Sequence, residues 1–530
     1  MIGYQFLLEI DALDNLNNPV TKRFCCQPGF SGGGYTWEPY IVDPGLVQTT
    51  LFSGDKMTGK SSHSFGEVVL GNFKDVTDVT GPTDYLKDYK FYGRPIRMYM
   101  GLAAGSYPAE FQQQYVGIIE NFTIGEDTVS FTLHGRQAEL NIPLDGGTFL
   151  GDNVAPGGFE GDATLKGANK PIVIGRVFNA PVSLCNASKL IYAVSPLTGI
   201  ATLAELNSGL RVFDNGVELF CTGSVASKTD LLTGTTNPGE YRASSDGYIQ
   251  LGSTPVGQIT VSCASQGKAL ASTPVNLITQ IFTLADAVPG RTHSNFVDMI
   301  DGDSFTGFAD TFERGLFIRG NLNISEILDK LVTPCGYWYF TPLGKIRVKT
   351  IALSGFTPTY AAVGSTNIES FSIHKTSDTK GGVPASSVVL KCSKNNTLQA
   401  NLSTKVDAIR GARLGLEWLR YEIPSTDFIF PLSEEFVIET ALHGSTYFDQ
   451  GAYDLKTIVR TIFCKKHSMA IVGISTLDFL NALPVQPGDV ITLDLAGRFG
   501  YSGDSMLVVG KTINYVEETV SLVLWDIAGD

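Results

Sequence analysis

Charged side chains are scarce in this chain. Asp, Glu, Lys and Arg make up 17% of its 530 residues, whereas an average soluble protein has about 25%. Acidic residues outnumber basic ones by 53 to 39, so the formal net charge is −14. Because tight non-specific binding to nucleic acid needs a surplus of cationic side chains, this balance argues against a DNA-binding protein.

Long hydrophobic runs are also missing. No stretch of 18 apolar residues occurs, so we expect no membrane-spanning segment. The first residues have no basic start, and Glu9 and Asp11 interrupt the opening apolar segment. This is not the pattern of a secretory signal peptide. We therefore expect the protein to fold in the cytoplasm of the cell that makes it.

No Cys-x-x-Cys pair and no His-Glu-x-x-His motif occur, so no metal site and no thioredoxin-like motif are predicted. We interpret the cysteines as free, buried thiols, with a redox role for the adjacent pair Cys25 and Cys26 as the alternative. The eight cysteines are Cys25, Cys26, Cys185, Cys221, Cys263, Cys335, Cys392 and Cys464. The six histidines are His63, His134, His293, His374, His443 and His467.

Glycine and apolar residues take the place of charge. The chain has 57 glycines and is 43% hydrophobic and 10% aromatic, which supplies several packed cores and excludes a disordered chain. Residues 127–135 alternate apolar and polar side chains, as half-buried strands do. Within residues 516–524, Val520, Leu522 and Leu524 alternate in the same way after Val516-Glu-Glu518. Short apolar runs at 171–175 and 258–263 are also typical of strands, and residues 337–349 predict a hairpin.

Helices are predicted only in the second half of the chain. A Thr-Pro start and a one-sided apolar stripe predict a helix over residues 273–285. A second stripe covers residues 324–331. The strongest helical pattern, at i, i+3, i+4, i+7 and i+8, covers residues 455–463, and a shorter helix is predicted between residues 433 and 444. These elements define an α+β chain that is predominantly β.

Two sequence motifs match catalytic or binding patterns but stand in the wrong context. Residues 54–61 fit the phosphate-binding pattern Gly-x-x-x-x-Gly-Lys-Ser, which needs a helix to follow. Residues 62–72 instead predict a strand, so we interpret the match as a turn with an exposed lysine, with a nucleotide site as the alternative. Residues 29–33 fit the nucleophile elbow around Ser31, but no helix follows it either.

A third motif also fails. Asp301 and Asp303 could begin a calcium-binding loop, but Phe305 and Phe312 occupy positions where that loop needs oxygen ligands. We interpret it as a polar turn. We therefore predict no enzyme and assign no catalytic, cofactor-binding or metal-binding residue.

Several segments follow one another in a familiar order along nearly the whole chain. They include Phe65-Gly-Glu-Val-Val-Leu-Gly-Asn72 and Val485-Gln-Pro-Gly-Asp-Val-Ile-Thr-Leu493. The others are residues 84–97, 115–119, the strand ending at residue 136, and residues 165–179, 190–194, 327–331, 335–340, 344–348 and 498–500. Together they resemble the central tail-hub, or baseplate-hub, proteins of long-tailed bacteriophages.

This resemblance implies a structural virion protein at the tail tip. Each chain of a homotrimer would supply two tail-tube-like β-barrels, so that three chains join a sixfold tail tube to a threefold tip and gate genome ejection. Its implied partners are the distal tail protein or tube ring, the tape-measure protein, and tail fibre or receptor-binding proteins. DNA would pass the lumen without specific binding, since an acidic wall repels phosphate.

Within this scheme we predict four domains. Residues 1–148 form an N-terminal β-barrel-like domain, and residues 149–272 a β-rich domain that is either consecutive or inserted. Residues 273–365 form an α+β domain, and residues 366–530 a C-terminal β-barrel-like domain with helices. The boundary near residue 148 rests on the Gly-, Asp- and Pro-rich residues 145–161. The alternative functions are an envelope-degrading hydrolase and a host-binding adhesin at the tail tip.

Overall fold

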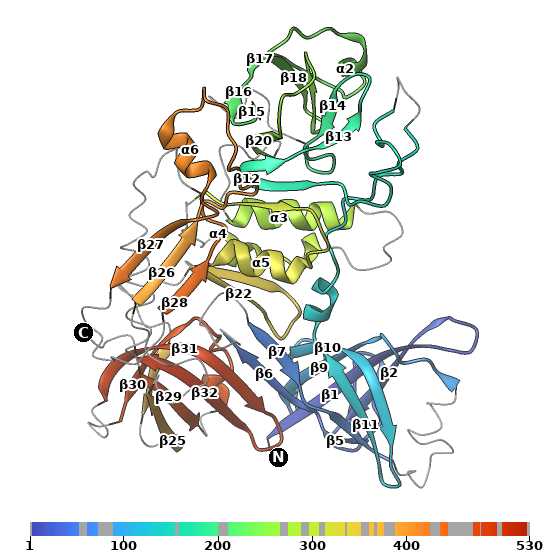
Figure 1. The fold of residues 1–530 in the computed structure, drawn as a ribbon. Coiled ribbons are helices and arrows are strands. Elements are labelled where there is room, and N and C mark those ends of the chain that lie inside the picture. The colour runs from blue at the N-terminus through green and yellow to red at the C-terminus, as the bar shows by residue number, and fades with distance from the viewer. Residues whose placement is uncertain are drawn as a thin grey trace.

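The structure is a computed structural model in which strands predominate and the helices are short (Figure 1), which confirms the α+β, predominantly β class. It describes residues 3–51, 61–72, 88–153, 158–199, 210–265, 274–287, 296–306, 313–333, 336–350, 360–364, 368–375, 387–424, 435–443, 470–476, 479–495 and 501–526. The N-terminal and C-terminal sheets, blue and red in Figure 1, lie side by side at one end of the molecule. Two helices cross the middle, and the green strands form the other end.

The N-terminal sheet has seven strands. Their order is β2 (Pro19–Cys25), β1 (Tyr4–Leu13), β9 (Pro95–Leu102), β10 (Phe111–Ile124), β11 (Thr128–His134), β8 (Val68–Gly71) and β5 (Ile41–Asp43). Strand β11 confirms the strand predicted over residues 127–135, and it ends before a 3-10 helix, η1 (Arg136–Leu140). A small hairpin of β3 (Ser31–Gly32) and β4 (Tyr35–Thr36) lies outside this order.

The C-terminal sheet takes in two strands from the other end of the chain. Its order is β24 (Tyr360–Gly364), β30 (Val490–Asp494), β31 (Ser502–Asn514), β32 (Thr519–Asp526), β29 (Ala470–Thr476) and β25 (Ile368–Lys375), with β6 (Leu46–Thr50) paired to β31 and β7 (Ser62–Phe65) paired to β6. Strand β32 confirms the predicted alternation in residues 516–524. The four-domain division stays a prediction, but these pairings place residues 46–50 and 62–65 in the C-terminal sheet.

One hydrophobic core lies between the two sheets. It contains Phe6, Met98 and Tyr115 from the first sheet and Tyr515 and Leu524 from the second. The rings of Phe6 and Tyr515 lie 6.1 Å apart, edge to face, which is a favourable aromatic geometry. The two ends of the chain therefore fold together as one body.

A helical layer and a hairpin lie above this body. Helices α3 (Pro274–Asp286) and α5 (Ile324–Val332) bury apolar stripes against β22 (Gly336–Phe340) and β23 (Ile346–Thr350). They confirm the helices predicted from residues 273 and 324 and the hairpin over 337–349, although Thr273 lies outside the described residues. A capping box of Asn323 and Glu326 begins α5, and η2 (Val297–Met299) and α4 (Gly302–Thr306) flank the hairpin.

The far end of the molecule contains two five-stranded sheets that confirm the strands predicted near residues 171 and 258. One has the order β16 (Val217–Glu218), β15 (Arg211–Asp214), β20 (Ile259–Ala264), β12 (Ile172–Pro181) and β21 (Gly315–Ile318). The other has the order β13 (Ser183–Asn186), β14 (Ile191–Ala193), β19 (Tyr248–Leu251), β18 (Glu240–Ser244) and β17 (Phe220–Val225), with the short helix α2 (Asp230–Thr233) beside it.

The remaining sheet corrects one prediction. Its order is β27 (Leu419–Pro424), β26 (Ser387–Cys392) and β28 (Glu435–Glu439), and α6 (Ala408–Leu414) lies nearby. The helix predicted between residues 433 and 444 is wrong, because residues 435–439 form β28, parallel to β26. The run Phe436-Val-Ile438 suits a strand, since parallel strands favour continuous β-branched and apolar residues. The helix predicted over residues 455–463 lies outside the described residues.

Candidate functional site

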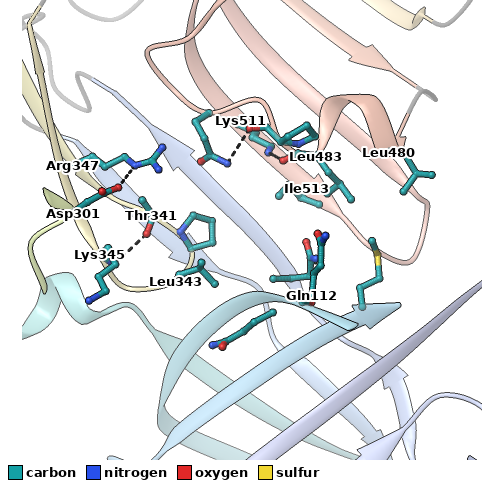
Figure 2. Close-up of a pocket in the computed structure, with 16 residues that line it drawn as sticks. Gln112, Asp301, Thr341, Leu343, Lys345, Arg347, Leu480, Leu483, Lys511 and Ile513 are labelled. Atoms are coloured by element: carbon teal, nitrogen blue, oxygen red, sulfur yellow. Dashed lines mark hydrogen bonds and ion pairs between the residues drawn. The ribbon is translucent and has the colours of Figure 1, made fainter. Parts of the chain in front are cut away.

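A cleft of about 510 Å³ lies where the two sheets of the body meet the hairpin above them (Figure 2). Strands β9 and β10 supply one wall, and the turn between β22 and β23 supplies the second. Short helix α9 (Phe479–Ala482), the loop after it and β31 form the third. The volume falls in the range of about 300–1,000 Å³ that is typical of ligand pockets.

The hairpin turn is held in the cleft by local bonds and by a bond to the sheet. The Thr341 amide donates to the Lys345 carbonyl at 2.7 Å, and the Gly344 amide donates to the Thr341 carbonyl at 2.9 Å. Gly344 has a φ of +73°, and a Cβ there would lie 2.7 Å from Cδ of Arg136, so glycine suits the position. The Val116 amide of β10 donates to the Pro342 carbonyl at 2.9 Å. These bonds fix the second wall against the first.

A β-bulge brings glutamine side chains to the first wall. The register of β10 against β9 shifts between Gln113 and Tyr115, so Gln114 has no partner across the ladder. Bulges of this kind redirect side chains from one face of a strand to the other. Gln112, Gln113 and Gln114 all line the cleft, and Gln112 is exposed. They present amide donors and acceptors to any ligand.

The third wall contains a buried amine. Lys511 of β31 is 5% exposed, and its Nζ donates to the Leu483 carbonyl at 2.6 Å and to the Val485 carbonyl at 2.7 Å. Burial lowers the pKa of Lys511 to about 7, although the nearby carboxylate of Asp489 opposes this effect. Desolvation disfavours the charged form of an amine that has no carboxylate bonded to it. This residue was not singled out from the sequence, where its signal is a lone lysine inside the apolar strand at residues 506–513.

Two ion pairs border the cleft on the hairpin. Arg347 Nε lies 2.5 Å from a carboxylate oxygen of Asp301, and Lys349 Nζ lies 3.0 Å from a carboxylate oxygen of Asp489. Asp489 also accepts a 2.7 Å bond from the Gln486 amide. These bonds connect the hairpin to the turn before β30. Partial burial alone would lower the pKa of Arg347, but the bond to Asp301 and the neighbouring Tyr339 outweigh this effect and raise the pKa, so this cation stays charged.

The composition of the cleft suits the binding of a ligand. Its described lining residues provide amides, one threonine hydroxyl, three basic side chains, the carboxylate of Asp301 and apolar side chains. The arrangement can therefore hold a ligand by hydrogen bonds, charge and apolar contact.

Ser61, the last residue of the phosphate-binding match at residues 54–61, does not line this cleft. Residues 54–60 lie outside the described residues, and Ser61 is buried. The segment that follows forms strands β7 and β8, which confirms the strand predicted over residues 62–72. Phosphate binding in such a loop relies on the N-terminus of a helix at this point.

The residues of the nucleophile-elbow match and of the calcium-loop match do not form a catalytic or metal site among the described residues. Ser31 is exposed in the β3–β4 hairpin, and strand β4 follows it where a nucleophile elbow has a helix. Asp301 is paired with Arg347, and Asp303 lies in the first turn of α4. No group of three or more His, Cys, Asp or Glu side chains that could hold a metal occurs within the described ranges.

The described cysteines are free thiols. Cys25 is buried, and burial raises its pKa to about 12, while burial also raises the pKa of Cys26. A raised pKa removes the thiolate that redox chemistry needs. His63 is half-buried: its ring nitrogen Nδ1 lies 2.8 Å from the Thr49 hydroxyl, and desolvation lowers its pKa to about 4. Cys335 and Cys464 lie outside the described residues.

Comparisons with known proteins find structures but no sequence family. No model of a protein family matches the chain, and no curated protein matches it. A tail protein from Neisseria meningitidis MC58 aligns with a TM-score of 0.37 at 10% identity, over 99% of this chain and 97% of that one. A 43 kDa tail protein of prophage MuSo2 from Shewanella oneidensis gives 0.40 at 8% identity, over 98% of both chains. A prophage tail protein from Listeria monocytogenes EGD-e gives 0.30 at 8%, over 98% and 94%.

These TM-scores lie below 0.5, so the three likenesses do not establish a shared fold. The helices that the structure describes include none long and apolar enough to cross a membrane.

Proposed function

We propose that this chain is a structural protein of a bacteriophage tail, namely the central hub of the tail tip or baseplate. In this proposal three copies form a ring that joins the sixfold tail tube to a threefold tip and gates genome ejection. The ring contacts the distal tail protein, the tape-measure protein and the fibre or receptor-binding proteins. Support comes from the ordered segments that resemble hub proteins and from the paired sheets of the body.

The paired sheets are the observation that carries the proposal. A seven-stranded and an eight-stranded sheet lie side by side, and β6 pairs with β31 from Gly510 opposite Thr50 to Asn514 opposite Leu46. Each chain thus contributes two comparable β units that share one hydrophobic core. Three such chains supply six units, which is the number needed to match a sixfold tube.

The charge of the chain agrees with a passage for DNA. Its net charge is −14, and acidic walls repel phosphate, so a genome would slide through a ring of these chains without being held. The proposed site of action is the virion, after assembly in the host cytoplasm. The proposed role is structural and involves no catalysis.

The test is the oligomeric state of the purified protein together with its place in the virion. Light scattering should give a particle of three times the 57.0 kDa chain mass, and electron microscopy should show a ring with a central pore. Gold-labelled antibody should bind tail tips. A protein that stays monomeric at high concentration and is absent from labelled tail tips would contradict the proposal.

A further inference from the structure

The cleft between the two sheets and the hairpin differs in charge from the rest of the chain. Its described lining residues include three basic side chains, Lys345, Arg347 and Lys511, and one acidic side chain, Asp301. The whole chain has the opposite balance, with a net charge of −14. A local surplus of positive charge on an acidic protein attracts an anionic partner and directs it to this place.

Lys345 and Arg347 are the basic side chains of the cleft that can meet a ligand, because Lys511 is buried and already donates to the Leu483 and Val485 carbonyls. Lys345 is exposed, and its Nζ donates to the Asp298 carbonyl. Arg347 donates its Nε to Asp301, and its side chain is 32% exposed. An ammonium has three N–H donors and a guanidinium five. The bonds to Asp298 and Asp301 therefore leave donors on Lys345 and Arg347 for a carboxylate.

The rest of the cleft suits a peptide better than a small ion. Leu343 and Leu480 on opposite walls are 47% and 52% exposed (Figure 2), and they offer apolar contact that a free anion cannot use. The glutamines of β10 and Gln486 can bond to main-chain amides and carbonyls. Apolar surface with a few placed polar groups is the usual composition of a binding pocket.

We propose that this cleft binds an extended acidic segment of a partner protein. One carboxylate of the segment bonds to Lys345 and Arg347, its apolar side chains contact Leu343 and Leu480, and its main chain bonds to the glutamines. Nucleic acid is the less suitable occupant, because the chain as a whole repels phosphate. The proposal does not rest on the structural role in a phage tail, since it follows from the composition of the cleft.

The test is a selection of peptides on the full-length protein. A ribosome-displayed library of random nine-residue peptides is selected on the immobilised chain, and the recovered peptides are measured by fluorescence anisotropy. Three variants are compared, namely Lys345→Glu and Leu343→Asp in the cleft and Lys166→Glu as the matched control. Lys166 is exposed and lies outside the cleft. Thermal unfolding checks that all three fold, which is expected because all three positions are exposed.

The expected peptides are enriched in Asp and Glu. Their affinity should fall about tenfold or more in both cleft variants and stay unchanged in Lys166→Glu, because only the cleft variants bring a like charge against the ligand. Replacing each Glu of a selected peptide by Gln should weaken it similarly. Recovery of no peptide above background, of peptides without acidic enrichment, or of peptides that bind the cleft variants unchanged would overturn the proposal. So would competition by succinate alone at the same concentration as the peptide.

Discussion

The rings of Tyr115 and Tyr515 lie 6.3 Å apart in the shared core, although they belong to the N-terminal and C-terminal sheets. Both side chains are completely buried. Their hydroxyls differ, however, because Tyr115 donates to the Pro44 carbonyl, whereas the Tyr515 hydroxyl has no hydrogen-bond partner among the described residues. Two neighbouring tyrosines thus contribute different amounts to stability.

This difference predicts opposite effects of the same substitution. Tyr115→Phe leaves a buried carbonyl unpaired and should lower the free energy of unfolding by about 1–3 kcal/mol. Tyr515→Phe removes an unpaired buried hydroxyl and should leave stability unchanged or raise it, since burying such a group is unfavourable. Urea unfolding followed by tryptophan fluorescence measures both. Equal destabilisation by the two variants would show that the Tyr515 hydroxyl is bonded.

The second prediction concerns the contact between the hairpin and the turn before β30, and it compares two glycines. Gly488 has a φ of +87°, and a Cβ there would lie 1.9 Å from the Tyr337 hydroxyl. Gly503 has a similar φ of +83°, but no atom of the described residues lies within 4 Å of a Cβ placed there. Gly503→Ala should therefore cost about 1–2 kcal/mol from backbone strain alone, and Gly488→Ala should cost clearly more.

The measurement for this pair is the midpoint of thermal unfolding of each variant. Both alanines adopt the same unfavourable backbone conformation, so the difference between them reports the steric contact with Tyr337. Equal midpoints for the two variants would contradict the close contact between Gly488 and the Tyr337 hydroxyl.

Local patterns predicted much of the fold but not the way its parts combine. The alternation at residues 127–135 and 516–524 and the stripes at 273–285 and 324–331 identified strands and helices, because side-chain burial imposes the periods 2 and 3.6 on the sequence. Residues 435–439 were misassigned, since a short apolar run near a cap suits either a helix or a buried strand. The pairing of β6 with β31 is long-range and leaves no local pattern.

The cleft could not be found from the sequence for a similar reason. Its walls come from residues near 112, 343 and 511, and their proximity depends on the tertiary arrangement. Gln112-Gln-Gln114 looks like an ordinary polar stretch, and the bulge that turns these side chains toward the cleft depends on the pairing with β9. Lys511 has a local signal, a charge among apolar strand residues, but it was not singled out from the sequence.

Lys511 makes the stability of the protein depend on pH. Its pKa is about 7 in the folded protein, against an ordinary value of 10.5, so the unfolded chain binds more protons between these values. Stability therefore rises with pH between about 7 and 10, and the contribution of this group is at most ~1.4 kcal/mol per pH unit. Below pH 7 the contribution of Lys511 no longer changes.

The variant Lys511→Met isolates this effect, because other groups titrate in both proteins alike. The free energy of unfolding is measured for both proteins from pH 7 to pH 10. The value for the original chain minus the value for Lys511→Met should increase as pH rises over this range. Lys166→Met, at an exposed position, should show no such trend. A difference that stays flat across this range would contradict the lowered pKa of Lys511.

The last prediction concerns the adjacent cysteines Cys25 and Cys26 and tests the alternative that they have a redox role. Burial raises the pKa of Cys25 to about 12, so at pH 8 its thiol is almost wholly protonated, and the thiolate is the form that reacts. We expect Cys25 in the folded protein to react with a disulfide reagent at least about tenfold more slowly than in 8 M urea. Mass spectrometry of tryptic peptides measures the modification at Cys25 and at Cys221, whose partly exposed thiol is the internal control. The same raised pKa affects stability. The protonated Cys25 thiol contributes fully to the free energy of unfolding below about pH 8.5, the pKa of a thiol in the unfolded chain, and this contribution is lost as pH rises toward 12. Rapid modification of Cys25 at pH 8, or a disulfide between Cys25 and Cys26 after mild oxidation, would restore the redox interpretation.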